Sequence, residues 1–329
     1  MNVFKKTTSA PKVHRPLTLA NMSNITLGVL LALTVYFFYT AGDAVVKFVG
    51  YRASVFEIGL FVTIFSLLPG IFSKPRSETW GEAISLVNPM YSHLIGVLRA
   101  ISATAGTYAF ISIPLSEAYS IIFLTPVFIT LLSVVSLKEK VTSTRWLLTF
   151  ISFASVVIVV RPGFQELNWG HISALLAAIC SSSATTLTRT VARTERRLAL
   201  FLFPGLYTAG LNIIALIVVG FTWPDAWDLL LLLVAGLLNG FAYIMLIAAL
   251  TLSPANRIAP IQYSQMVWGL AFGALFFNEV PDTIAFIGLG ALIFAGVANV
   301  VADGAQARIA SRWAEYRALR QGDPPPPIN

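Results

Sequence analysis

NITLGVLLALTVYFFYTAGDAVVKFVG, residues 24–50, is the first of ten hydrophobic stretches that follow one another along the chain to about residue 301. Each stretch is close to the roughly 20 apolar residues that a helix needs to cross the hydrocarbon core of a bilayer. Only helices and closed barrels satisfy their backbone hydrogen bonds in hydrocarbon, and continuous apolar runs favour helices over alternating strands. The sequence therefore predicts an all-α integral membrane protein and excludes water-soluble folds.

Ten spans leave no room for a soluble domain in 329 residues, of which 57% are hydrophobic and 11% charged. Residues 24–50 are too long for a signal peptide, so we expect an uncleaved first helix. The single cysteine, Cys180, excludes an internal disulfide. The predicted transmembrane helices cover residues 24–50, 54–72, 91–112, 115–137, 143–160, 169–191, 198–220, 227–250, 255–278 and 282–302.

The basic residues predict which way these helices run. If the N-terminus is cytoplasmic, eighteen Lys and Arg residues fall in inner segments, and only Arg52 and Arg161 fall in outer loops. This asymmetry follows the positive-inside rule and explains the net charge of +7 without nucleic acid as a partner. We expect an inner-membrane protein with a cytoplasmic basic leader, residues 1–23, and a cytoplasmic basic, Pro-rich tail, residues 303–329. The tail is either a solvated segment or an amphipathic helix on the membrane surface.

The chain also resembles itself across its middle. LSEA at residues 115–118 and LSPA at residues 252–255 each open an apolar stretch that has an early proline break and ends in a single glutamate. The match predicts two five-helix repeats, residues 24–162 and 168–302. An odd number of spans per repeat forces opposite orientations, so the repeats are expected to be inverted. Inverted repeats are a recurrent architecture of secondary transporters, with the binding site at the repeat interface.

Several short motifs identify a family resemblance. The first half carries LR (98–99), LSEA (115–118), FLTP (123–126), LKEK (137–140), RW (145–146) and RPG (161–163), and the second carries APIQY (259–263), VW (267–268) and FNEVP (277–281). With these motifs the chain resembles EamA-type transporters of the drug/metabolite transporter superfamily over nearly all of residues 24–302. The resemblance implies ten helices in two inverted halves around a central cavity. It also implies transport of small metabolites, such as amino acids, S-adenosylmethionine or riboflavin, by import or export.

The ninth predicted span is the best candidate wall of a substrate site. Gln262, Tyr263, Gln265 and Trp268 bring amide, phenol and indole groups to one helix near the bilayer centre. These groups suit a polar cargo with a flat ring, and a proline break at Pro260 frees a backbone carbonyl nearby. The alternative is aromatic packing with interhelical hydrogen bonds.

Further binding candidates lie on three other spans: Asn239 and Tyr243 on the eighth, Tyr119 on the fourth and Arg99 on the third. Arg99 lies deep in its span, where a charge costs roughly 2.5–3.5 kcal/mol. Its guanidinium matches a carboxylate or phosphate of a substrate. Alternatively, it has a structural role and ties a neighbouring helix.

Four charged residues are candidates for coupling or gating: Asp43, Lys47, Glu57 and Glu117. Asp43 and Lys47 are four residues apart, which suits either binding of a zwitterion or an intrahelical ion pair. If transport is proton-coupled, the carriers are expected among Asp43, Glu57 and Glu117.

Other function classes fit the sequence less well. The three histidines have no metal-ligand spacing and there is no phosphate-binding glycine loop, so neither an enzyme, a metal nor a cofactor is expected. A channel is not indicated either, because the sequence shows no repeated pore motif. A sensor that binds without translocation remains an alternative. Close helix crossing at Gly236-x-x-x-Gly240 and Gly269-x-x-x-Gly273 is compatible with a homodimer. The sequence thus favours a secondary transporter of a small organic metabolite.

Overall fold

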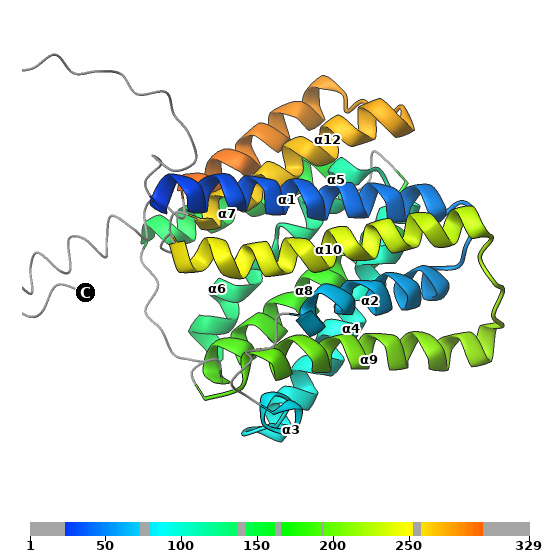
Figure 1. Ribbon diagram of the computed structural model, residues 1–329. Helices are drawn as coiled ribbons and strands as arrows, with labels where there is room; N and C mark the ends of the chain where they lie inside the picture. Colours follow the sequence, from blue (N-terminus) through cyan, green and yellow to red (C-terminus); the bar gives the residue numbers. More distant parts are fainter. Residues whose placement is uncertain are drawn as a thin grey trace, which may run out of the picture.

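The computed structural model describes residues 24–72, 79–136, 143–161, 166–191, 194–252 and 258–298, and the described residues contain helices but no β-strand. The predicted leader and tail and the SPA part of the second repeat motif lie outside them. The helices are α1 (Asn24–Val49), α2 (Val55–Phe72), α3 (Trp80–Ala83), α4 (Pro89–Ser112), α5 (Leu115–Ile122), α6 (Thr125–Ser136), α7 (Ser143–Val160), α8 (Trp169–Val191), α9 (Arg197–Val219), α10 (Ala226–Leu252), the 3₁₀ helix η2 (Ala259–Tyr263), α12 (Ser264–Phe277) and a last helix, Thr283–Ala298 (Figure 1).

Six helical segments in the described part of the chain are long and apolar enough to cross a membrane: Thr26–Val49, Pro89–Ser112, Leu115–Leu132, Trp169–Thr188, Leu198–Val219 and Ala226–Leu246. Three shorter apolar helices accompany them: Val55–Ile71, Trp146–Val160 and Thr283–Ala298. The bundle therefore has the composition of a multi-pass membrane protein, as the hydrophobic pattern predicts.

Two helices are interrupted where the sequence predicts proline breaks. α5 ends at Ile122 and α6 begins at Thr125, one residue before Pro126. In the second half, the turn that contains Pro260 is a 3₁₀ helix, η2, before α12 continues as an α-helix. Because proline lacks a backbone N–H and clashes with the preceding turn, the first break falls just before Pro126 and the second in the turn that contains Pro260. The two predicted breaks are confirmed.

The helices pack in a reciprocal pattern between the two halves. α4 packs most extensively against α8 and also against α9, while α10 packs against α1 and α2 (Figure 1). α4 and α10 are the third predicted spans of their repeats. Each of them therefore contacts the first and second predicted spans of the other repeat. α5 and α12 also contact each other across the interface. The halves therefore interlock rather than fold side by side.

A pair of glutamates repeats this reciprocity at opposite ends of the bundle. Near the start of α2, Glu57 accepts a hydrogen bond from the backbone amide of Thr222, 2.7 Å away in the segment before α10. Just before α9, Glu195 accepts from the amides of Val87 and Asn88, at 2.9 and 2.8 Å, in the segment before α4. Glu57 thus holds the segment that leads into α10, and Glu195 holds the segment that leads into α4. We call these ends of the bundle the Glu57 end and the Glu195 end.

Glu195 makes the stability of the fold depend on pH. Burial raises the pKa of its carboxyl, but the amides of Val87 and Asn88 and the hydroxyl of Ser92 donate to it and together hold the pKa below its ordinary value of 4.5. A lowered pKa contributes stability above the pKa of the unfolded chain, and this contribution is lost as the pH falls through the folded value. Glu195→Gln is expected to reduce the loss of thermal stability on acidification from about pH 6 to about pH 3.

Melting curves of the purified protein over this pH range measure the effect. Glu166→Gln is a matched control, since Glu166 lies exposed before α8. An unchanged pH dependence in Glu195→Gln would contradict the role of these hydrogen bonds.

Candidate functional site

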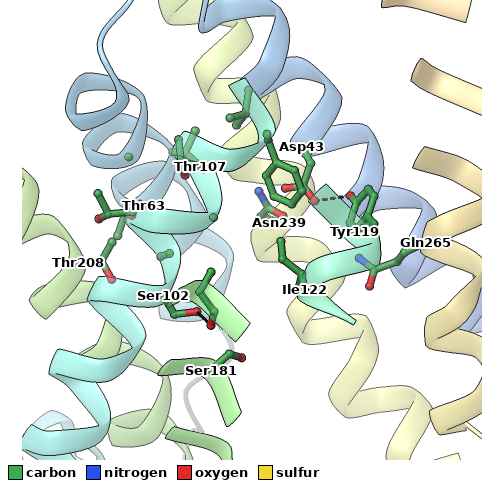
Figure 2. A pocket seen from close by; sticks show the side chains of 18 of the residues that line it. Asp43, Thr63, Ser102, Thr107, Tyr119, Ile122, Ser181, Thr208, Asn239 and Gln265 are labelled. Carbon is green, nitrogen blue, oxygen red and sulfur yellow. Dashed lines mark hydrogen bonds between the residues drawn. The ribbon is translucent and has the colours of Figure 1, made fainter. Parts of the chain in front are cut away.

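A cavity of about 320 Å³ with a mixed polar and apolar lining lies between helices of both halves. Figure 2 shows Asp43 and Tyr119 on one side of it and Ser102 and Ser181 at another. The described residues that line it are Asp43, Val46, Gly59, Val62, Thr63, Ser102, Ala103, Thr104, Gly106, Thr107, Phe110, Tyr119, Ile122, Phe123, Ala177, Ser181, Thr208, Asn239, Gln262 and Gln265. The cavity draws on both halves because their helices interlock.

The acidic group of the cavity is Asp43 of α1. Its carboxylate accepts a hydrogen bond of 2.6 Å from the hydroxyl of Tyr119 on α5 (Figure 2). The ring of Tyr119 is held between Phe110 and Phe123, with ring centroids 5.2 and 6.0 Å away, and is only 2% exposed. Since the ring is fixed on both sides, Tyr119 orients the carboxylate of Asp43 toward the cavity.

Hydroxyl groups form much of the remaining wall, and the sequence interpretation missed most of them. Ser102 of α4 donates to the backbone oxygen of Ala177 on α8 at 2.9 Å, and Thr208 donates within α9. Thr104 Oγ1 is buried and has no hydrogen-bond partner among the described residues. Single Ser and Thr residues are common in membrane helices, so only the density of hydroxyl residues on α4, which also carries Thr107, could have drawn attention to them. These groups offer donors and acceptors to a small polar molecule.

Several predicted binding residues meet at this cavity. Gln262 of η2, Gln265 of α12, Asn239 of α10 and Tyr119 of α5 all line it, and so does the predicted coupling residue Asp43. The two predicted walls, from the eighth and ninth spans, therefore face the same space. The structure adds α4 and α8 as the opposite wall.

The two aromatic candidates of the ninth span do not line the cavity. Tyr263 is buried against Phe123, with ring centroids 5.3 Å apart. Trp268 packs edge to face on Phe37 at 5.2 Å, and its buried indole Nε1 has no partner among the described residues. These rings pack behind the wall that Gln262 and Gln265 form.

Arg99 and Tyr243 lie beside the cavity. The guanidinium of Arg99 donates to Ser181 Oγ at 3.4 Å and to Thr185 Oγ1 at 3.1 Å, both on α8. Ser181 itself lines the cavity. Tyr243 stacks on Phe201, with ring centroids 4.6 Å apart. Arg99 therefore ties α4 to α8 through hydroxyl groups, not through a carboxylate.

Lys47 pairs with Glu279 rather than with Asp43. The ammonium lies 2.5 Å from Glu279 Oε1 and donates to the backbone oxygen of Ile113 at 2.7 Å. Glu279 Oε2 also accepts from the amide of Leu115, at 3.0 Å. α12 ends at Phe277, and the left-handed residue Asn278 that follows it, φ 57°, turns Glu279 back toward α1. The intrahelical ion pair that the spacing of Asp43 and Lys47 suggests does not form. Asp43 lines the cavity without Lys47 as a partner.

The other two coupling candidates lie outside the cavity. Glu57 accepts backbone hydrogen bonds, as described above, and Glu117 contacts His171 Nε2 at 3.1 Å. Neither glutamate is among the described residues that line the cavity. Among the described residues no group of three or more His, Cys, Asp or Glu side chains has an arrangement that could hold a metal ion.

Comparison with known proteins gives a consistent picture. The model of the EamA-like transporter family matches residues 26–161 and again residues 168–302. A solved crystal structure superposes with a TM-score of 0.61 at 18% identity, covering 84% of this chain and 96% of that one, which shows a shared fold.

Three curated relatives are transporters by name. An S-adenosylmethionine uptake transporter of Rickettsia conorii is 26% identical over 74% of this chain and 82% of its own. A riboflavin transporter of Rhizobium johnstonii is 24% identical over 69% of this chain and 76% of its own. The pseudopaline exporter CntI of Pseudomonas aeruginosa is 26% identical over 81% of this chain and 93% of its own. The relatives thus include proteins named for uptake and for export.

Proposed function

We propose, given that the chain belongs to the EamA-like transporter family, that it is a secondary transporter moving a small organic metabolite across the membrane by alternating access. The observation that carries this proposal is the cavity that helices of both halves line with hydroxyl, amide and carboxylate groups. A ligand site at a repeat interface allows one repeat to move against the other around bound substrate. Its action involves no catalytic step and no cofactor.

The proposed topology has ten spans in two inverted repeats, residues 24–162 and 168–302. α5 with α6 forms one span, η2 with α12 forms another, and both termini are cytoplasmic in a bacterial inner membrane. The reciprocal packing, the two broken helices and the glutamates at opposite ends support an inverted arrangement. The positive-inside asymmetry supports the orientation. The Glu195 end is then cytoplasmic.

Within the cavity, Gln262, Gln265, Asn239 and Tyr119 are the proposed substrate-binding side chains. Their amide and phenol groups hydrogen-bond the cargo, while Asp43 supplies the only formal charge of the described lining. Three aromatic side chains outside the lining stabilise this wall through their ring contacts: Tyr263, Trp268 and Tyr243. Asp43 is also the proposed coupling residue, because it is the one predicted carrier that reaches the cavity.

The proposed cargo is a small polar metabolite of the kind that the named relatives carry: S-adenosylmethionine, riboflavin or an amino-acid derivative. Import and export are both compatible with alternating access, which runs according to the gradients. Purified protein in liposomes tests the proposal. Exchange of labelled internal for unlabelled external metabolite should require the protein, whereas binding without any exchange would favour a sensor.

Gln262→Ala and Gln265→Ala are each expected to lower transport at subsaturating substrate by about 2- to 10-fold. Each substitution removes a hydrogen bond to the cargo, which contributes about 0.5–1.5 kcal/mol. Initial exchange rates in proteoliposomes, normalised to the amount of inserted protein, give the measurement. Val267→Ala is the control, because Val267 is on the same helix but is 52% exposed on the outside of the bundle. Normal rates in both glutamine variants would remove η2 and α12 from the site.

A further inference from the structure

We propose that the cavity selects amphoteric substrates, with Asp43 binding the cationic group and Arg99 the anionic group. This inference rests on the proposed transport function and specifies its substrate class. Asp43 of α1 lines the cavity, Arg99 of α4 contacts the lining residue Ser181, and the structure gives neither charge an ionic partner among the described residues.

Arg99 extends the lining face of α4 by one turn. Ala103, Gly106 and Phe110 line the cavity, and these positions follow Arg99 by four, seven and eleven residues. Residues at this spacing lie on one face of an α-helix. On α8, Ala177 and Ser181 line the cavity, and Thr185 continues that face. Arg99 therefore lies one turn before the lining residues of α4 and contacts Ser181 and Thr185 on α8, at the edge of the cavity.

The hydrogen bonds of Arg99 leave its charge uncompensated. The described residues place no carboxylate within 4.0 Å of the guanidinium, and its partners are the hydroxyls of Ser181 and Thr185. Two hydroxyls use two of the five donors that a guanidinium offers. The remaining donors and the full positive charge suit a carboxylate or phosphate, which a guanidinium binds through two parallel hydrogen bonds. Ser181 links this group to the cavity.

Asp43 is uncompensated in the same way. Its carboxylate accepts from the neutral Tyr119, and no Lys, Arg or His of the described residues forms an ion pair with it. The nearest cation along α1, Lys47, is engaged by Glu279. Since an isolated charge in a membrane protein is costly, an opposite charge brought by the substrate is favoured at each of these positions. A molecule with both charges satisfies both.

A proteoliposome assay with a mixture of metabolites tests this selectivity even though the cargo is unidentified. The mixture contains amines, organic acids, nucleosides, flavins, amino acids and sulfonium compounds, and mass spectrometry identifies what the protein moves. We expect the transported compounds to carry both charge signs. Each is then compared with its carboxyl methyl ester and with its derivative lacking the cationic charge. Each derivative is expected to lose at least about 30-fold in apparent affinity.

Charge variants locate the two contacts. In Arg99→Gln, the penalty for esterifying the substrate is expected to shrink to less than about threefold, because the ester no longer loses a partner. In Asp43→Asn, the penalty for removing the cationic group of the substrate should shrink in the same way. The charge-conserving variants Arg99→Lys and Asp43→Glu should retain most of the selectivity. Ser181→Ala should raise the KM, whereas Ser183→Ala is the matched control on α8, because Ser183 donates only to its own helix.

The outcomes separate the two proposals. Transport of neutral or singly charged compounds alone would overturn the amphoteric site and leave the transporter assignment intact. Absence of transport for every compound in well-folded protein would overturn the transporter assignment itself. The derivative series uses the unmodified protein, so it decides the inference even if a charge variant fails to fold.

Discussion

Lys47→Met is expected to lower the free energy of unfolding by about 3–5 kcal/mol, because it leaves Glu279 without its cation in a largely buried site. The Lys47 side chain is 3% exposed and that of Glu279 is 19% exposed. The ion pair also joins α1 of the first half to the end of α12 in the second, and Glu279 holds the first residue of α5. Equilibrium unfolding in mixed detergent micelles measures the loss.

Two further variants test the cause of this loss. The double variant Lys47→Met with Glu279→Gln should recover much of the stability, since replacing both charges removes the unpaired ion. Asp282→Asn is the comparison variant, because the Asp282 side chain, which pairs with Arg161 at the same end of the bundle, is 53% exposed while that of Arg161 is 20% exposed. Water screens the Asp282 carboxylate, so this variant should lose clearly less stability than Lys47→Met. Equal losses in both single variants would contradict the assignment of Lys47–Glu279 as a buried structural pair.

Gly269→Ala is expected to cost about 1–3 kcal/mol of stability and to reduce transport, because the added methyl group overpacks the interface of α12 and α5. A Cβ atom at Gly269 would lie 2.5 Å from the Cδ2 atom of Tyr119. The ring of Tyr119 is held by Phe110 and Phe123, so it moves only with its neighbours. Any such shift weakens the hydrogen bond from Tyr119 to Asp43 in the cavity.

Thermal unfolding and initial transport rates measure this effect together. Gly290→Ala is a matched control on the last helix, since a Cβ there meets nothing within 4 Å. Alanine in place of an unconstrained helical glycine stabilises by about 0.5–1 kcal/mol. Opposite signs of the stability change at the two glycines would support close packing at Gly269. A neutral Gly269→Ala variant with normal transport would rule it out.

The all-helical character of the chain and its two helix breaks could be predicted because they depend on local signals. Apolar stretches of membrane-spanning length, the proline breaks at Pro126 and Pro260 and the duplicated motif near Leu115 are visible without any tertiary information. The helix-forming segments and both breaks agree with the structure. α12 is a weaker case, since the described helix has only 14 residues and is shorter than the roughly 20 residues that cross a bilayer.

The ionic contacts could not be predicted, because they depend on which helices meet. The i, i+4 spacing of Asp43 and Lys47 favours a local pair, but the left-handed turn at Asn278 places Glu279 beside Lys47. Nothing in the neighbouring sequence identifies that contact. The same holds for Ser102 and Thr104, whose place in the cavity follows from the packing of α4 on α8.

The interlocking of the halves also sets an order of events during biosynthesis. The hydroxyls that receive hydrogen bonds from Arg99 lie 82 and 86 residues further along the chain, on α8. A ribosome adds about 5–20 residues per second, so α4 is synthesised several seconds before these partners exist. The nascent first half therefore carries an unsatisfied guanidinium while it enters the bilayer. Its tertiary assembly is a post-insertion step that waits for the second half to be translated.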